Sequence, residues 1–251
     1  MNSMLKTVNL CKSYGALRVT DGVPIDIHTG ELHAIIGPNG AGKTTLINQL
    51  CGELASDSGE VHFAGTNVTH SGIQARARQG LLRSYQITSV FDEFTVLENV
   101  TLAALGSQQH AFGAWQALLR QPAALQSAHQ GMSLAGLQHL AGEKVSELAY
   151  GERRQLELAM ALAARPRFLL LDEPMAGMSV QESAAVVALL QSLKGKYTIL
   201  LVEHDMNAVF ALADRISVLV YGQLLITGTP DEIRQNAEVR AVYLGDEEIS
   251  A

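Results

Sequence analysis

The sequence predicts an α/β fold in which a largely parallel sheet is interrupted by a helical insertion. Three observations lead to this prediction. Short apolar runs such as residues 167–172 alternate with helical segments, which is typical of a parallel sheet covered on both faces. Residues 1–30 contain alternating stretches and glycine turns, which favour antiparallel hairpins. Residues from about 95 to 164 are rich in Ala, Leu and Gln at helical spacing.

Apolar periodicity and turn residues predict the individual elements. Thr95 and Glu98 have the spacing of a capping box, which marks the start of the insertion. Gly52 is expected to end the first helix, and Gly222 to turn a hairpin. In chain order, we expect a strand at 31–37, a helix at 43–52, a turn-strand-turn unit at 58–68, a strand at 167–172, a helix at 179–195, a strand at 198–204, a helix at 206–214, a hairpin at 215–228, and one short helix with an acidic end at 234–251.

Composition excludes several classes of protein. A chain of 251 residues that is 47% hydrophobic can bury a sizeable core, and a net charge of −7 gives no electrostatic reason to expect nucleic-acid binding. Cys11 and Cys51 match no metal motif, so we expect reduced thiols. No secretion signal is visible, and every apolar run is shorter than the ~20 residues that span a bilayer. We therefore expect a soluble chain, which can still have a membrane partner.

Residues 37–44, GPNGAGKT, match the phosphate-binding pattern G-x-x-x-x-G-K-[ST]. The predicted strand before the loop and the predicted helix after it supply the required context. Glycines let backbone N–H groups turn toward a polyphosphate, and the helix adds its positive end. Lys43 brings a cation to the outer phosphates, and the Thr44 hydroxyl can bind Mg²⁺. The loop alone indicates a nucleotide phosphate site without naming its reaction.

Acidic residues follow the buried strand at 167–172. Asp172 is placed at the carboxyl end of this strand, where ligands sit in parallel sheets, and can hold Mg²⁺. Glu173 can orient or deprotonate an attacking water. The alternative is a plain helix cap before Pro174, which the glycine loop makes the weaker interpretation.

Two further polar residues have a possible role and a structural alternative. His204 follows an apolar strand and can reach a γ-phosphate, although a lone histidine is usually structural. Gln86 precedes the helical insertion, and its amide can touch Mg²⁺ and sense the phosphate. The remaining histidines show no metal-ligand pairing and are interpreted as structural or solvent-exposed.

The order of these motifs closely resembles the ATP-binding subunit of ABC transporters over essentially the whole chain. The motifs are the glycine loop, Gln86, LAYGE at 148–152, LLLDEP, AGMS at 176–179, and His204. The resemblance implies an α/β P-loop NTPase (RecA-like) core with an antiparallel β subdomain and a helical subdomain. On this basis residues 1–86 and 165–234 form the core and β subdomain, about 87–164 the helical subdomain, and 235–251 a C-terminal tail.

The resemblance also implies Mg²⁺-dependent ATP hydrolysis in a head-to-tail dimer, with each ATP held between two subunits. Glu173 resembles the catalytic base and His204 the switch histidine, and AGMS resembles a loop that crosses the dimer interface. Tyr14 resembles the aromatic that stacks on adenine. The phosphate contacts implied are Gly37, Pro38, Asn39, Gly40, Ala41, Gly42, Lys43, Thr44 and Thr45. The metal contacts implied are Thr44, Gln86 and Asp172. The residues implied to contact the ATP of the other subunit are Leu148, Ala149, Tyr150, Gly151 and Glu152.

The LAYGE segment departs from the commonest family pattern, L-S-G-G-Q. Ala149 replaces a serine, Tyr150 a glycine, and Glu152 a glutamine. A helix is predicted to follow, so our hypothesis is that backbone N–H groups at its start, including that of Gly151, take over the lost hydroxyl contact.

Three parts of the chain resemble ATPases of branched-chain amino-acid uptake systems, a group that includes urea and amide importers. They are the LAYGE segment, the stretch EHDMNAV at 203–209, and the ending of the chain. YLGDEE and IQARARQG also resemble the lipopolysaccharide-export ATPase, which is the second choice. A soluble ABC ATPase of translation or repair is a third reading, disfavoured because the chain has one glycine loop and no heptad run. The presence of Glu173 and His204 argues against a nucleotide-binding regulator that does not hydrolyse ATP. The presence of LAYGE argues against a simple P-loop kinase.

The importer reading implies partners and a location. The chain is expected to act as a homodimer, or as a heterodimer with a paralogous ATPase, on integral-membrane permease subunits. A solute-binding protein would act indirectly, and no nucleic acid is involved. The location implied is the cytoplasmic face of the inner (plasma) membrane. Phe91 and Phe94, within residues 87–96, can line a groove for a permease helix, or can be ordinary core residues.

Overall fold

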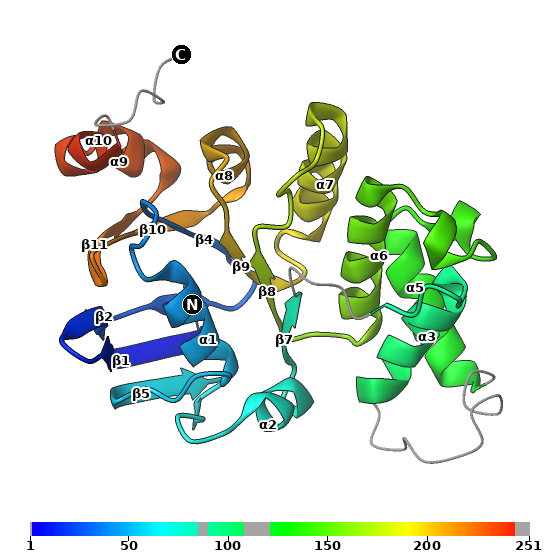
Figure 1. Ribbon diagram of the computed structural model, residues 1–251, viewed down its shortest axis with the longest axis horizontal. Coiled ribbons are helices and arrows are strands. Elements are labelled where there is room, and N and C mark those ends of the chain that lie inside the picture. Colours follow the sequence, from blue (N-terminus) through cyan, green and yellow to red (C-terminus); the bar gives the residue numbers. More distant parts are fainter. Residues whose placement is uncertain (1, 85–89, 108–120, 244–251) are drawn as a thin grey trace. The chain divides into compact units, whose positions relative to one another are not determined.

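The computed structural model describes residues 2–84, 90–107 and 121–243 (Figure 1). Its contacts divide the chain into two compact units, one of Met1–Arg76 with Leu193–Ala251 and the other of Ala77–Ser192. This division is made by contacts, and each unit contains both strands and helices. The subdomain boundaries expected after residues 86, 164 and 234 therefore stay a prediction.

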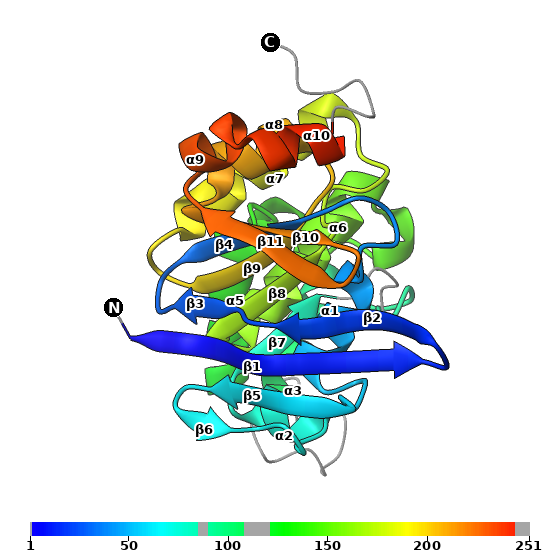
Figure 2. The same ribbon diagram turned by 90° about the vertical axis from the view of Figure 1, so that its left-hand side faces the viewer.

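The first unit contains an antiparallel sheet built around the long strand β1 (Ser3–Tyr14). β1 pairs with β2, β3 and β5, and β5 pairs with β6, all antiparallel (Figure 2). These strands are β2 (Leu17–Val23), β3 (Asp26–His28), β5 (Ser58–Phe63) and β6 (Thr66–Asn67). The prediction of an antiparallel opening region is confirmed.

A second group of strands in this unit is parallel. β4 (Leu32–Ile36) lies between β9 (Thr198–Val202) and β10 (Arg215–Val220), and Ala34 pairs with Leu201 on one side and Ile216 on the other. Every residue of β4 and β9 is buried, which accounts for their apolar runs. β11 (Gln223–Gly228) returns antiparallel to β10 after a turn at Tyr221 and Gly222, as predicted.

Helices cover both faces of the parallel strands. α1 (Lys43–Cys51) lies between them and the antiparallel sheet, and α8 (Met206–Leu212), α9 (Pro230–Gln235) and α10 (Ala237–Tyr243) lie on the opposite face (Figures 1 and 2). The prediction of a short helix within residues 234–251 is confirmed by α10, whereas α9 was not predicted, and the expected acidic end at 244–251 lies outside the described residues. α9 ends at Gln235, and Asn236 separates it from α10 by accepting a hydrogen bond from Val239 N at 2.9 Å.

Arg76, in the short helix α2 (Ile73–Arg78), is the largest fully buried side chain of the described residues. Its guanidinium donates to four backbone carbonyls, those of Gln49, Leu50, Thr69 and Ser71, at 2.6–3.1 Å. Two of these carbonyls belong to the last turn of α1, where helical partners are lacking. Arg76 therefore fixes the C-terminal end of the helix that follows the glycine loop.

A chain of polar groups is buried beside β4. His33 Nδ1 donates to Glu31 Oε1 at 2.8 Å, and His33 Nε2 lies 2.8 Å from Ser217 Oγ, which lies 2.6 Å from Thr227 Oγ1. Arg215 approaches Glu31 Oε1 at 3.4 Å. Burial alone would raise the pKa of Glu31, but the hydrogen bonds from His33 and the His28 backbone, with the charge of Arg215, lower it overall.

The described residues of the second unit include the parallel strands β7 (Leu81–Ser84) and β8 (Phe168–Asp172). α3 (Val96–Ser107), α5 (Pro122–Leu134) and α6 (Tyr150–Ala163) pack on one another, and α7 (Val180–Leu193) follows β8. The predicted capping box is confirmed, because Thr95 N donates to Glu98 Oε2 at 2.8 Å and Glu98 N to Thr95 Oγ1 at 3.2 Å. Short 3₁₀ turns occupy Gln138–Leu140 and Val145–Glu147.

Candidate nucleotide site

The glycine loop leaves β4 after Ile36 and enters α1 at Lys43. Gly42 has φ +99°, and a Cβ there would lie 2.3 Å from Val19 O. A Cβ on Gly37 would lie 2.1 Å from Leu219 O. Both positions therefore accept only glycine, and the bare backbone inferred from the sequence has a steric reason.

Lys43 folds back over the loop. Its buried Nζ donates to Gly37 O at 2.6 Å and to Pro38 O at 3.1 Å. Thr44, the next residue in the first turn of α1, is exposed, and Thr45 is half-buried. The loop thus presents a cation, a hydroxyl and the start of a helix at one place, which is the chemistry that a polyphosphate requires.

Tyr14 ends β1 with its ring exposed, and Lys12 Nζ lies 5.8 Å from the ring centroid. An exposed ring is free to stack on a base. His204 also belongs to this unit and lies just beyond the end of β9, with its side chain exposed. Its backbone N donates to Glu203 Oε2 at 3.0 Å. The first unit therefore contains the predicted adenine, phosphate and switch residues.

Asp172 is the last residue of β8, as predicted, and its side chain is buried. It accepts a hydrogen bond from Arg83 Nη2 at 2.8 Å. Glu173 follows in the left-handed region at φ +49°, a conformation that costs a non-glycine residue energy. Such strain is common where function fixes a side chain's direction. Gln86, the third predicted metal contact, lies outside the described residues.

The donor set expected for Mg²⁺ is a hydroxyl from Thr44, an amide from Gln86 and a carboxylate from Asp172. Hydroxyl, amide and carboxylate oxygens are the ligands that this hard cation prefers. Of these side chains, Thr44 is exposed and Asp172 is hydrogen-bonded to Arg83. The residues fit the metal in type. No group of three or more His, Cys, Asp or Glu side chains with metal-binding geometry exists among the residues that the structure describes.

The LAYGE segment forms the start of α6. Ala149 is the residue before the helix, and its N donates to Glu152 Oε2 at 2.8 Å. Tyr150 is exposed, and its hydroxyl donates to Ala176 O at 3.0 Å. Gly151 is buried, and its N donates to Glu182 Oε1 at 3.2 Å. Leu148 is buried just before the helix. The segment thus has the predicted position at a helix start.

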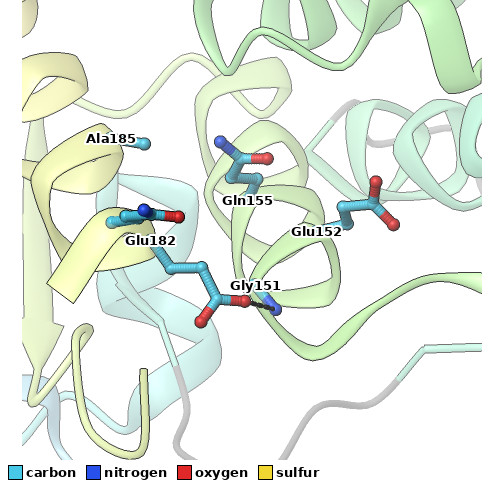
Figure 3. A pocket seen from close by; sticks show the side chains of 6 residues that line it. Gly151, Glu152, Gln155, Glu182 and Ala185 are labelled. Atoms are coloured by element: carbon cyan, nitrogen blue, oxygen red, sulfur yellow. Dashed lines mark hydrogen bonds between the residues drawn. The ribbon is translucent and has the colours of Figure 1, made fainter. Parts of the chain in front are cut away.

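Sequence reasoning missed two residues of this unit, Arg83 and Glu182. Arg83 is 89 positions from its partner Asp172, and no local pattern announces their contact. Glu182 was readable in part, because Ser179 and Glu182 have capping-box spacing. Its additional hydrogen bond with Gly151 could not be predicted from the sequence. Figure 3 shows Glu182 directed at Gly151 across a hollow that Gln155 and Ala185 also line, while Glu152 points away.

The expected permease-facing segment lies partly outside the described residues, since 87–89 are not among them. Phe91 is exposed, Phe94 is half-buried, and their rings stack at 5.2 Å between centroids. The neighbouring acids are paired, Asp92 with Arg153 at 3.0 Å and Glu93 with Lys144 at 3.3 Å. An exposed aromatic ring stacked on a half-buried one, with a charged rim, is a surface suited to a protein partner. No described helix has the length and hydropathy needed to cross a bilayer.

Comparison with known proteins agrees with this geometry. The profile described as ABC transporter matches residues 20–176, and that described as Branched-chain amino acid ATP-binding cassette transporter matches residues 223–249. The high-affinity branched-chain amino acid transport ATP-binding protein LivG of Salmonella typhimurium is 37% identical over 98% of this chain and 100% of its own length. BraF of Pseudomonas aeruginosa, which has the same description, is 34% identical over 97% of this chain and 98% of its own.

A solved structure and a relative of another type complete the comparison. The ADP conformation of MJ1267, an ATP-binding cassette of an ABC transporter, superposes with a TM-score of 0.84 at 28% identity, over 98% of this chain and 100% of that one. The lipopolysaccharide export ATP-binding protein LptB of Escherichia coli is 32% identical over 97% of this chain and 98% of its own. The predicted P-loop NTPase fold is confirmed, and the chain belongs to the ABC transporter family as one of its ATP-hydrolysing, ATP-binding subunits.

Proposed function

We propose that this chain powers a membrane importer for branched-chain or related amino acids. The observation that carries the solute class is the profile match at residues 223–249, together with LivG and BraF at nearly full length. LptB, the exporter alternative, has lower identity. A soluble ABC ATPase remains the least supported of the three, because the relatives named here are transport proteins.

ATP is the substrate, and residues 37–45 hold its phosphates. The steric requirement at Gly37 and Gly42 keeps this backbone open to the ligand. Lys43 exchanges its bonds to the loop carbonyls for the outer phosphates, where its charge offsets the charge that develops during hydrolysis. Tyr14 stacks on the adenine. Mg²⁺, held by Thr44, Gln86 and Asp172, would supply charge neutralisation at the phosphates.

Glu173 acts as the base that orients and deprotonates the attacking water, and His204 steadies the γ-phosphate. The strained backbone of Glu173 supports this role, because it fixes the direction in which the carboxylate leaves β8. The residues Leu148–Glu152 complete the site of a second subunit in a head-to-tail dimer, either of two copies or with a paralogue. Catalysis then depends mainly on positioning and charge stabilisation at dimer closure.

Coupling requires a contact with the permease. The exposed ring of Phe91, stacked on Phe94, supports a docking surface for a short permease helix. The chain would thereby be held at the cytoplasmic face of the inner (plasma) membrane. A solute-binding protein would act on the other face, without touching this chain.

Reconstitution of the chain with its permease in proteoliposomes tests the proposal. We expect leucine, isoleucine or valine, delivered by the binding protein, to raise ATP turnover and to accumulate inside the vesicles. A transporter carrying Glu173→Gln is the control and should assemble without accumulating solute. ATP turnover that continues with no accumulation of any branched-chain amino acid would contradict the proposal, and extraction of a lipid from the membrane would favour the exporter.

A further inference from the structure

Glu182 in the first turn of α7 uses its two carboxylate oxygens for different partners. Oε2 accepts from Ser179 N at 2.8 Å and from Ser179 Oγ at 2.7 Å, while Glu182 N donates to Ser179 Oγ at 3.3 Å. These contacts cap α7. Oε1 accepts from Gly151 N at 3.2 Å, in the first turn of another helix, α6 (Figure 3). One carboxylate therefore joins the starts of two helices.

Any side chain at Gly151 would require the Glu182 side chain to move. A Cβ there would lie 2.4 Å from Glu182 Oε1 and 2.9 Å from its Cγ and Cδ. A second tie lies beside it, the Tyr150 hydroxyl bond to Ala176 O at 3.0 Å. The segment 148–152 is thus joined to the segment 176–179 and its following helix at two points.

The position that Glu182 occupies is one that favours an anion. Backbone N–H groups at a helix start lack helical partners and carry the positive end of the helix dipole. Hydrogen bonds from the Ser179 side chain, from Ser179 N and from Gly151 N lower the pKa of Glu182, so the carboxylate is ionised at neutral pH. In the chain by itself, an internal anion already satisfies the Gly151 N–H.

The proposed function requires the same N–H for a different anion, the γ-phosphate of ATP bound to the other subunit. A carboxylate and a phosphate at hydrogen-bond distance from one N–H would repel each other strongly, so only one can be seated. The phosphate does not compete for the partners of Oε2, since both belong to Ser179, the residue before α7.

We propose that Glu182 is a positioning residue that occupies the phosphate contact of Gly151 until the other subunit's ATP displaces it. Oε1 then leaves Gly151 while Oε2 remains on Ser179. Arrival of the phosphate is thereby transmitted to the segment 176–179, and closure requires more ATP than it would without this internal competitor. The inference rests on the proposed contact between Leu148–Glu152 and the ATP of a second subunit.

ATP-dependent dimer formation tests the inference in the full chain. In the Glu173→Gln background, where dimers are expected to persist because hydrolysis is blocked, light scattering gives the ATP concentration at half-maximal dimerisation. Adding Glu182→Gln keeps the side chain's shape and removes its charge. We expect the midpoint to fall by about threefold to tenfold, since the phosphate no longer has to displace a charged group.

Glu232→Gln is the matched control. Glu232 caps α9 by the same contacts with Thr229, at 2.7 Å and 3.0 Å from its Oε2 and 3.4 Å from its N, and belongs to the other unit. Removing its charge should leave the midpoint unchanged. An unchanged or raised midpoint in Glu182→Gln, or an equal fall in both variants, would overturn the inference. Thermal unfolding without nucleotide checks that both variants fold.

A second readout needs no dimer. In the ¹⁵N-labelled chain, the Gly151 amide resonance should shift on Glu182→Gln and not on Glu232→Gln, because only the first substitution changes its acceptor. No shift would overturn the inference even if the substitution alters dimerisation. A different outcome is that Glu173→Gln alone forms no ATP-dependent dimer although the Gly151 resonance shifts on Glu182→Gln. That outcome would contradict the proposed function, and with it the displacement of Glu182 by a phosphate.

Discussion

Arg83 Nη2 lies 2.8 Å from Asp172 Oδ2, so a guanidinium covers the carboxylate at the end of β8. The two residues lie on neighbouring parallel strands, and both side chains are less than 10% exposed. The Arg83 guanidinium therefore neutralises the carboxylate that is proposed to serve Mg²⁺. A buried carboxylate needs a partner of opposite charge, and a bound Mg²⁺ would replace or supplement Arg83 in that role.

Replacing Arg83 with Met should make stability depend more strongly on the ligand. Losing a cation beside the buried Asp172 carboxylate should lower the free energy of unfolding by about 1–3 kcal/mol. Mg-ATP should then raise Tm more in Arg83→Met than in wild type, because the metal compensates the same charge. Thermal unfolding with and without Mg-ATP measures this. The double variant with Asp172→Asn is the control, and equal increments in Arg83→Met and wild type would refute the prediction.

Arg76 should be essential to stability although no motif contains it. Arg76→Met fills similar space but leaves the carbonyls of Gln49, Leu50, Thr69 and Ser71 without the guanidinium donors. We expect a loss of about 2–4 kcal/mol in the free energy of unfolding, measured by urea denaturation. Arg78→Met, on the same short helix, is the control. Equal losses in the two variants would show that the four carbonyl bonds add nothing.

The buried group around Glu31 should contribute stability that depends on pH. The fold lowers the pKa of Glu31 below its ordinary value of 4.5. The ionised form is thus favoured by folding, and its contribution is full above 4.5 and lost as pH falls through the lower folded pKa. The free energy of unfolding of wild type should exceed that of Glu31→Gln by about 1–3 kcal/mol at pH 7, and this difference should shrink as pH falls below 4.5 and through the lower folded pKa. A difference that stays constant over this range would contradict the prediction.

The aromatic surface at Phe91 should matter for assembly more than for folding. Phe91→Ala removes an exposed ring and should change Tm little, whereas co-purification with the permease should fall severalfold. Glu93→Lys should weaken the same association, because it reverses a charge at the rim. Ile73→Ala, an exposed apolar residue of the other unit, is the control. Permease recovery that is equal for all three variants would exclude this surface as the docking site.

Local patterns were sufficient to predict most elements of this fold. The run of buried residues in β4, β8 and β9 gave the parallel strands, and Thr95 with Glu98 marked the start of the helical region. The glycine loop was predictable because φ and close contacts at Gly42 allow one residue type. In each case the cause lies within a few residues of its effect.

Contacts between distant side chains were not predictable. Glu182 and Gly151 are 31 positions apart, and their bond depends on the tertiary fold that brings the first turns of α6 and α7 together. Arg76 was inconspicuous because a buried arginine looks like a surface one in sequence. The break between α9 and α10 was missed because Asn236, a capping residue, lies in a polar stretch without apolar periodicity.

The central claim is that each ATP is completed by residues of two subunits, and the dependence of ATPase rate on protein concentration tests it most directly. With Mg-ATP saturating, the rate per chain should rise with concentration and level off as dimers fill, and Gly151→Asp should abolish the rise by placing a charged side chain at the helix start. A rate per chain that stays the same at every dilution, in wild type and in Gly151→Asp alike, would contradict the account.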